Sequence, residues 1–121
     1  MEERIQVIKH KGKEIVYVNY SGYAKDTEAE FIQMIDKVTQ FILKRGKNQL
    51  FLVNVENAYG STAILNKMKA DASKTKDCMA KQAVVGVTGA KAILLKAINM
   101  FALIDIKPFN AVDEAKDWLV K

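Results

Sequence analysis

The sequence predicts an α/β domain built on a five-stranded, mostly parallel sheet. From residue 14 onward, short apolar segments typical of strands alternate with amphipathic segments typical of helices. Such alternation implies parallel strands joined by helical crossovers. The segments 4–10 and 14–20 are separated only by a short turn on Gly12, so the first strand is expected to pair antiparallel with the second. No linker or repeat divides the 121 residues, which predicts one domain over residues 1–121.

The predicted order of elements is β-β-α-β-α-β-α-β-α. Strands are expected at residues 4–10, 14–20, 49–55, 82–87 and 106–109. The segment 49–55 is largely apolar, as in a buried central strand. Pro108 cannot donate a hydrogen bond to a neighbouring strand, so the last strand is expected at a sheet edge.

Four helices follow the second, third, fourth and fifth strands. They are expected from residue 26 or 27 to 45, from 61 or 62 to about 79, from 88 to 104 and from 110 to 121. Thr27 and Glu30 fit a capping box at the start of the first helix, and Gly46 is a natural stop for it. Asn110 is expected to cap the last helix.

Composition and charge restrict the setting and the partners. Cys78 is the only cysteine, and the charged residues scattered through the first twenty positions do not resemble a signal peptide, so a cytoplasmic setting is expected. The net charge of +5 comes mostly from lysine, with arginine only at Arg4 and Arg45. The lysine-rich helix lacks the aromatic residues and arginines of nucleic-acid platforms, so no nucleic-acid partner is expected. Contact with an anionic membrane surface or an acidic partner remains open.

No group of residues predicts catalysis, a metal or a cofactor. His10 is the only histidine, and no His/Cys pair has the spacing of metal ligands. Cys78 lies near a helix C-terminus, where the dipole does not favour a thiolate. The loop 86–91 departs from a phosphate-binding loop in its glycine spacing and lacks the hydroxyl after the lysine. We therefore expect a non-enzymatic domain.

Ligands of open α/β sheets bind outside the carboxyl ends of the parallel strands. Three loops are expected at that end: 20–27, 56–62 and 88–91. Their candidate binding residues are Tyr20, Tyr23, Asn57 and Tyr59. The tyrosines suit a ligand mouth because each has an apolar body and a polar tip, although they could equally cover the top of the core.

The helix at 88–104 contributes two further candidates. On a helical wheel, Lys91, Lys96 and Asn99 span one polar arc that is expected to face solvent. Leu95 falls inside this arc and Ile98 lies at its rim. They could form a small apolar patch for self-association or for an amphipathic ligand, or could be single exposed apolar residues without a role.

Three stretches together carry a family resemblance: "LVNVENAYGSTAIL", "QAVVGVTGAKAILLKAINMF" and "KPFNAVDEAKDWLV". With the order of elements, they make the whole chain resemble the STAS class, the sulfate-transporter and anti-sigma-factor-antagonist domains. In particular, the chain resembles the stand-alone bacterial SpoIIAA-like proteins. This resemblance implies a STAS fold and a non-enzymatic regulatory role through a protein partner or through self-association as a homodimer.

The resemblance also draws attention to Ser61 and Thr62. In the antagonist branch, the loop after the third strand reads Asp-Ser-Ser-Gly, and a partner kinase phosphorylates one serine. By position, Ser61 and Thr62 match the two serines, whereas Gly60 and Ala63 depart from the motif. The resemblance therefore implies a phosphoacceptor at Ser61 or Thr62, while the residues themselves predict that Ser61 caps the following helix.

Other SpoIIAA-like proteins resemble small ligand-binding or membrane-associating domains that are related in fold to lipid carriers. The leading expectation is a binding domain that acts through protein–protein interaction or self-association. The alternative is binding of an apolar or amphipathic, lipid-like small molecule, with peripheral membrane association.

Overall fold

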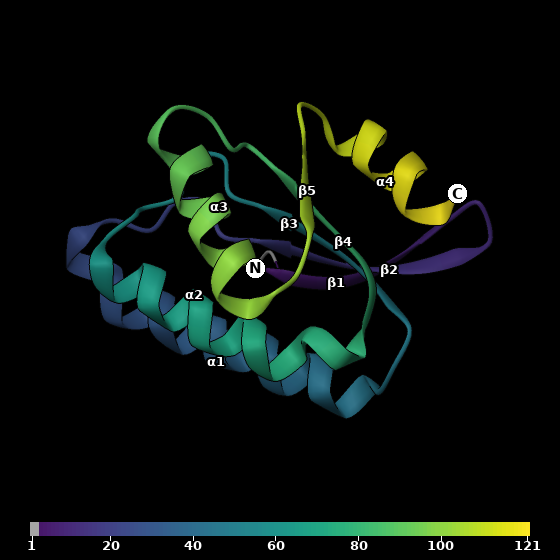
Figure 1. Cartoon of the computed structure of the whole chain (residues 1–121), viewed down its shortest axis with the longest axis horizontal. Helices are drawn as coiled ribbons and strands as arrows, with labels where there is room; N and C mark the ends of the chain where they lie inside the picture. Colours follow the sequence, from purple (N-terminus) through teal and green to yellow (C-terminus); the bar gives the residue numbers. More distant parts are fainter. Residues whose placement is uncertain (1–2) are drawn as a thin grey trace.

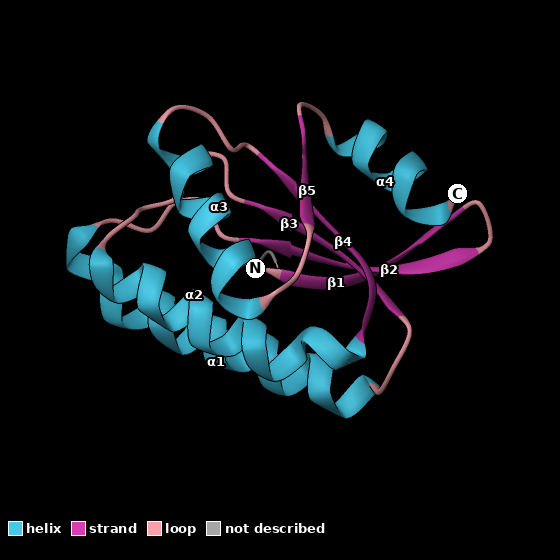
Figure 2. Ribbon diagram, in the orientation of Figure 1, coloured by secondary structure: helices cyan, strands magenta, loops and turns pink. Residues whose placement is uncertain are grey.

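Five strands form one mixed sheet in the order β1-β2-β3-β4-β5 (Figures 1 and 2). The computed structural model describes residues 3–121. The strands are β1 (Ile5–His10), β2 (Lys13–Asn19), β3 (Gln49–Asn54), β4 (Met79–Val85) and β5 (Ile106–Phe109). β1 pairs antiparallel with β2, and all other neighbours are parallel, as predicted. β5, which contains Pro108, lies at the sheet edge, as predicted.

Four helices connect or follow the strands, in the predicted order. They are α1 (Glu28–Arg45), α2 (Thr62–Thr75), α3 (Ala90–Ala102) and α4 (Val112–Val120), with short 3₁₀ helices at Lys25–Thr27 and Lys76–Cys78. The first three helices lie on one face of the sheet and α4 lies on the other (Figure 1). Within residues 3–121, no helix has both the length and the apolar character needed to cross a membrane.

Strand alternation divides the core into two layers. Val16, Val18 and Phe51 face α1 to α3, whereas their neighbours Ile15 and Leu52 face α4. Side chains alternate between the faces of a strand, so each central strand contributes to both layers. The loops that follow β2, β3 and β4 gather at one end of the sheet, as expected for parallel strands (Figure 2).

Two helix starts differ from the sequence prediction. The hydroxyl of Thr27 accepts a hydrogen bond from the backbone N–H of Ala24 at 2.8 Å, because a 3₁₀ turn precedes α1. It therefore does not form the predicted capping box with Glu30. Ala111, rather than Asn110, is the residue before α4, and no side chain caps that helix.

The boundary between α2 and β4 also differs. β4 begins at Met79, three residues before the predicted start, and Met79 pairs with Gln49. The helix ends at Thr75, whose hydroxyl donates to the carbonyl oxygen of Asp71 at 3.2 Å. A 3₁₀ turn then leads directly into the strand, leaving no room for the longer helix that the sequence predicted.

Candidate functional site

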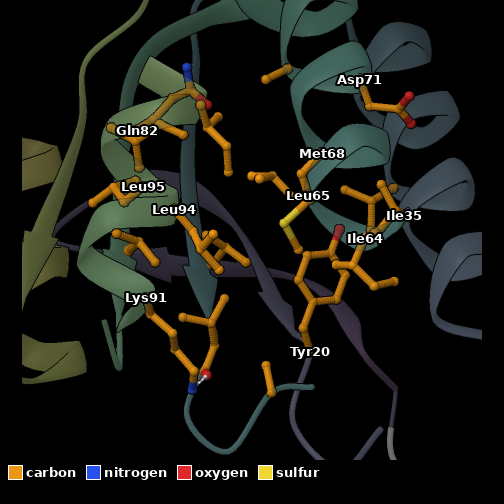
Figure 3. Close-up of a pocket in the computed structure, with 18 of the residues that line it drawn as sticks. Tyr20, Ile35, Ile64, Leu65, Met68, Asp71, Gln82, Lys91, Leu94 and Leu95 are labelled. Atoms are coloured by element: carbon orange, nitrogen blue, oxygen red, sulfur yellow. Dashed lines mark hydrogen bonds between the residues drawn. The ribbon is translucent and has the colours of Figure 1, made fainter. Parts of the chain in front are cut away.

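An apolar cavity lies between the sheet and the helices α1, α2 and α3. Its volume is ≈ 160 Å³. Leu65 and Met68 of α2 face Leu94 and Leu95 of α3 across it (Figure 3). An apolar cavity of about 150 Å³ is known to hold benzene, so this cavity has room for a small apolar group.

Two polar side chains of α3 fasten this helix over the cavity. Lys91 Nζ donates to the carbonyl oxygen of Val55 at 2.8 Å. The carboxamide of Asn99 donates to the carbonyl oxygen of Ile106 at 3.2 Å and accepts from its N–H at 2.9 Å. These contacts span the gap between α3 and the ends of β3 and β5, so the helix is held at two points along its length.

The predicted solvent-facing arc of α3 is therefore wrong for Lys91 and Asn99, which point inward. Leu95 and Ile98 turn inward with them and line the cavity rather than a surface patch. The helical wheel failed here because it counts every polar side chain as exposed, whereas these two are satisfied by backbone groups.

Other side chains of this segment are exposed instead. Four large apolar side chains are more than half exposed: Ile93 (71%), Met100 (75%), Phe101 (58%) and Leu103 (83%). We call these four residues, three in α3 and Leu103 at its C-cap, the outer row of α3. The helix thus has apolar side chains both toward the cavity and toward solvent.

Tyr20 projects its hydroxyl into the cavity from the end of β2 (Figure 3). The residue is only 5% exposed, and its ring packs against Phe31 with 5.2 Å between the centroids. Within residues 3–121 its hydroxyl has no hydrogen-bond partner. Burial, reinforced by the charge of Asp71, raises the pKa of Tyr20, so the phenol stays protonated at neutral pH and can donate or accept.

Tyr59 and Ser61 line the same cavity and share one carboxylate. The hydroxyl of Tyr59 donates to Glu28 Oε2 at 3.1 Å, and that of Ser61 donates to the same oxygen at 2.6 Å. Ser61 Oγ also accepts from the N–H of Ile64 at 3.2 Å, which confirms the predicted helix cap. Partial burial and the Glu28 carboxylate raise the pKa of Tyr59. Thr62 is exposed at the first position of α2.

Tyr23 and Asn57 lie outside the cavity. The ring of Tyr23 stacks on Phe31 with 4.5 Å between centroids, and the guanidinium of Arg4 lies 4.2 Å from the Tyr23 centroid. Asn57 is exposed in a turn with a φ of 55°. The expectation that three tyrosines share one pocket is thus corrected: Tyr20 and Tyr59 share it, and Tyr23 does not.

Sequence reasoning missed four buried polar residues of the cavity wall: Thr39, Asp71, Thr75 and Gln82. Gln82 is 8% exposed, and Asp71 is 4% exposed. Asp71 Oδ2 accepts from the hydroxyl of Thr39 at 2.7 Å, and Oδ1 lies 3.3 Å from Lys67 Nζ. The signal was available, because Asp71 falls on the apolar stripe of α2 and Gln82 alternates with the buried Val84.

Among residues 3–121, no group of three or more His, Cys, Asp or Glu side chains is arranged to hold a metal ion. His10, at the end of β1, does not line the cavity. Its Nε2 is 2.7 Å from Asp117 Oδ1 on α4, and Lys11 Nζ is 3.0 Å from the same oxygen.

The comparisons with known proteins agree with this fold. A family model described as SpoIIAA-like matches residues 15–120, from the third residue of β2 to the end of α4. A comparison with curated proteins gave no significant match.

Proposed function

The chain belongs to the SpoIIAA-like family of STAS-type domains, and on that premise we propose that it works without catalysis, by binding a small apolar molecule in the cavity under α3. The fold is the mixed five-stranded sheet of that family. STAS domains are regulatory and commonly interact with proteins. Ligand occupancy of the cavity is the signal that we propose this domain carries.

The cavity itself carries the proposal. Its wall is mostly apolar, and α3 covers it with the apolar side chains of Leu94, Leu95 and Ile98. Polar contacts of Lys91 and Asn99 hold the helix at two points. Transfer from water gives about 0.8 kcal/mol for each buried CH₂ group, so a six-carbon group would gain about 5 kcal/mol before the cost of association. That gain supports weak to moderate binding of a compact apolar ligand.

Toluene is a suitable first probe, since it matches the size of the cavity. We expect a toluene titration to shift the backbone amide NMR signals of the inward positions of α2 and α3. Ala72→Leu should fill part of the cavity, because Ala72 lines it, and should weaken toluene binding at least tenfold. Ala70→Leu is the matched control, because Ala70 is exposed on the same helix. Equal effects of the two variants, or no shifts on titration, would contradict this function.

A second candidate function is docking on an anionic membrane surface, favoured by the outer row of α3. The helix contains no acidic residue, its Lys96 is exposed, and Lys69 Nζ of α2 lies 5.7 Å from the ring centroid of Phe101. Large apolar side chains beside lysines are the composition of helices that lie in the membrane interface.

Vesicle flotation tests the second candidate. The protein should float with vesicles containing anionic phospholipid at low salt, and Phe101→Ser should weaken this binding about fivefold or more. Leu43→Ser is the control, because Leu43 is an exposed apolar residue of α1. If flotation fails while sedimentation shows association that Phe101→Ser abolishes, the outer row is an interface for a second copy or a protein partner instead.

A further inference from the structure

The two charged side chains that line the cavity in the described part of the chain already have partners. Lys91 Nζ bonds the carbonyl oxygen of Val55 at 2.8 Å. Asp71 Oδ2 accepts from Thr39, and Oδ1, which has no hydrogen bond within the described residues, forms an ion pair with Lys67 Nζ at 3.3 Å. In Figure 3, Leu94 and Leu95 lie across the cavity from Asp71, and the Asp71 carboxylate points away from them. Neither charge is directed at an occupant.

Two uncharged polar groups differ from the rest of the wall. The Tyr20 hydroxyl and the Gln82 carboxamide line the cavity, and each belongs to a residue less than a tenth exposed. Neither has a hydrogen-bond partner within residues 3–121. Neither is among the fully enclosed unpaired atoms of that part of the chain, which are Gln49 Oε1 and Asp71 Oδ1, so both keep accessible surface on the cavity wall. These two groups are therefore free to form a hydrogen bond with something that occupies the cavity.

The polarity of the wall selects against an ionised occupant. Moving a carboxylate out of water into an apolar site is costly unless a countercharge receives it. The negative field of Asp71, which helps to raise the pKa of Tyr20, also opposes an anion near that hydroxyl. A neutral hydroxyl, carbonyl or amide meets no such penalty and can bond the Tyr20 hydroxyl in either direction.

We infer that the occupant of the cavity is an uncharged amphiphile, a compact apolar body with a hydroxyl, carbonyl or amide oxygen that hydrogen-bonds to the Tyr20 hydroxyl. This inference rests on the proposed binding function and specifies its ligand class. The competing arrangement is an anionic amphiphile whose head group binds Lys91, which keeps two donors beyond its bond to Val55.

Three probes of similar size separate these ligand classes: toluene, benzyl alcohol and benzoate. Their affinities are measured by NMR titration with the wild-type protein and with Tyr20→Phe. The substitution removes one oxygen and keeps the ring that packs on Phe31. Tyr17→Phe is the matched control, because Tyr17 lies on β2 and belongs to the opposite core layer, where its hydroxyl accepts from Asn54 at 3.1 Å.

We expect Tyr20→Phe to weaken benzyl alcohol binding three- to tenfold and to change toluene binding less than twofold. Tyr17→Phe should change neither by more than twofold. Benzoate should bind at least tenfold more weakly than benzyl alcohol to the wild-type protein.

The possible contrary results are distinguishable. Equal effects of Tyr20→Phe on toluene and benzyl alcohol would overturn the inference and leave the binding function intact. Benzoate binding more tightly than benzyl alcohol, with Lys91→Met removing the difference, would overturn it in favour of an anionic ligand. No binding by any of the three probes would overturn the binding function itself.

Discussion

The hydroxyl of Ser61 lies 2.6 Å from Oε2 of Glu28, so the residue that caps α2 is also bonded to the first residue of α1. Tyr59 donates to the same oxygen at 3.1 Å. This geometry bears on phosphorylation at the loop, because a phosphate on Ser61 would meet a carboxylate. The neighbouring Thr62 is exposed at the helix N-terminus, where added negative charge is favourable.

Acidic substitutions should separate these two positions. Ser61→Asp should lower the free energy of unfolding by about 1 kcal/mol, because it places a second negative charge beside Glu28. Thr62→Asp should raise it by about 0.5 kcal/mol through the helix dipole. Urea denaturation measures both. Adding Glu28→Gln should recover most of the loss in Ser61→Asp, and failure to do so would remove Glu28 as the cause.

Asn99→Ala tests the attachment of α3. The change removes two hydrogen bonds and leaves the backbone N–H and carbonyl oxygen of Ile106 without partners. We expect a loss of about 2 kcal/mol in the free energy of unfolding. Hydrogen exchange should also become faster in α3 and β5. Asn66→Ala, at an exposed position of α2, should change stability by less than about 0.5 kcal/mol. Equal exchange in the two variants would contradict the attachment.

The fold was predictable because its signals are local. Alternating or continuous apolar residues indicate strands, amphipathic spacing indicates helices, and glycines such as Gly12 and Gly46 mark the ends of elements. The edge position of β5 followed from Pro108 alone. Helix starts were less predictable. The Thr27 hydroxyl accepts a hydrogen bond from Ala24 N–H because a 3₁₀ turn precedes α1, and no residue pattern predicts that turn.

The cavity was only partly predictable. Tyr20 and Tyr59 lie at the expected end of the sheet, because strand order and loop position follow from the element order. Tyr23 was misplaced because its ring packs on Phe31 and against the guanidinium of Arg4. No local sequence pattern predicts these contacts. The inward direction of α3 depends on bonds from Lys91 to a backbone carbonyl 36 residues away.

The contact of Asp117 with His10 and Lys11 predicts a pH dependence. Hydrogen bonds from His10 and Lys11 lower the pKa of Asp117 in the folded protein. A lowered folded-state pKa contributes stability above the unfolded-state pKa of about 3.9, and that contribution is lost as pH falls through the folded-state value. Asp117→Asn should therefore be less stable than wild type at pH 6, and the difference should shrink as the pH falls below the unfolded-state pKa of about 3.9.

Thermal unfolding across pH 2.5–6 measures this difference. Asp113→Asn is the control on the same helix, because Asp113 is almost fully exposed and its nearest cation, on Lys116, is 4.0 Å away. Asp113 lies in the first turn of α4, so Asp113→Asn should cost no more than about 0.5 kcal/mol at pH 6, through the helix dipole. A difference for Asp117→Asn that does not change between pH 6 and pH 2.5 would mean that the substitution acts by a route other than charge.

Gly86 is a position where adding a single methyl group should strongly destabilise the fold. Its φ is +94°, and a Cβ there would lie 2.5 Å from the backbone nitrogen of Glu56 and 2.8 Å from its Cα. The backbone cannot withdraw without moving the ends of both β3 and β4, which pair beside it. Gly86→Ala should lower the free energy of unfolding by about 3 kcal/mol, because it combines the strain of a left-handed backbone with overpacking.

Gly12→Ala isolates the contribution of the left-handed backbone, since φ is +83° there with nothing within 4 Å, and should cost about 1 kcal/mol. Equal losses in the two variants, measured by urea denaturation, would show that the close approach of Glu56 relaxes freely. A larger loss at Gly86 would show that the loops at the end of β3 and β4 are rigidly packed beside the cavity.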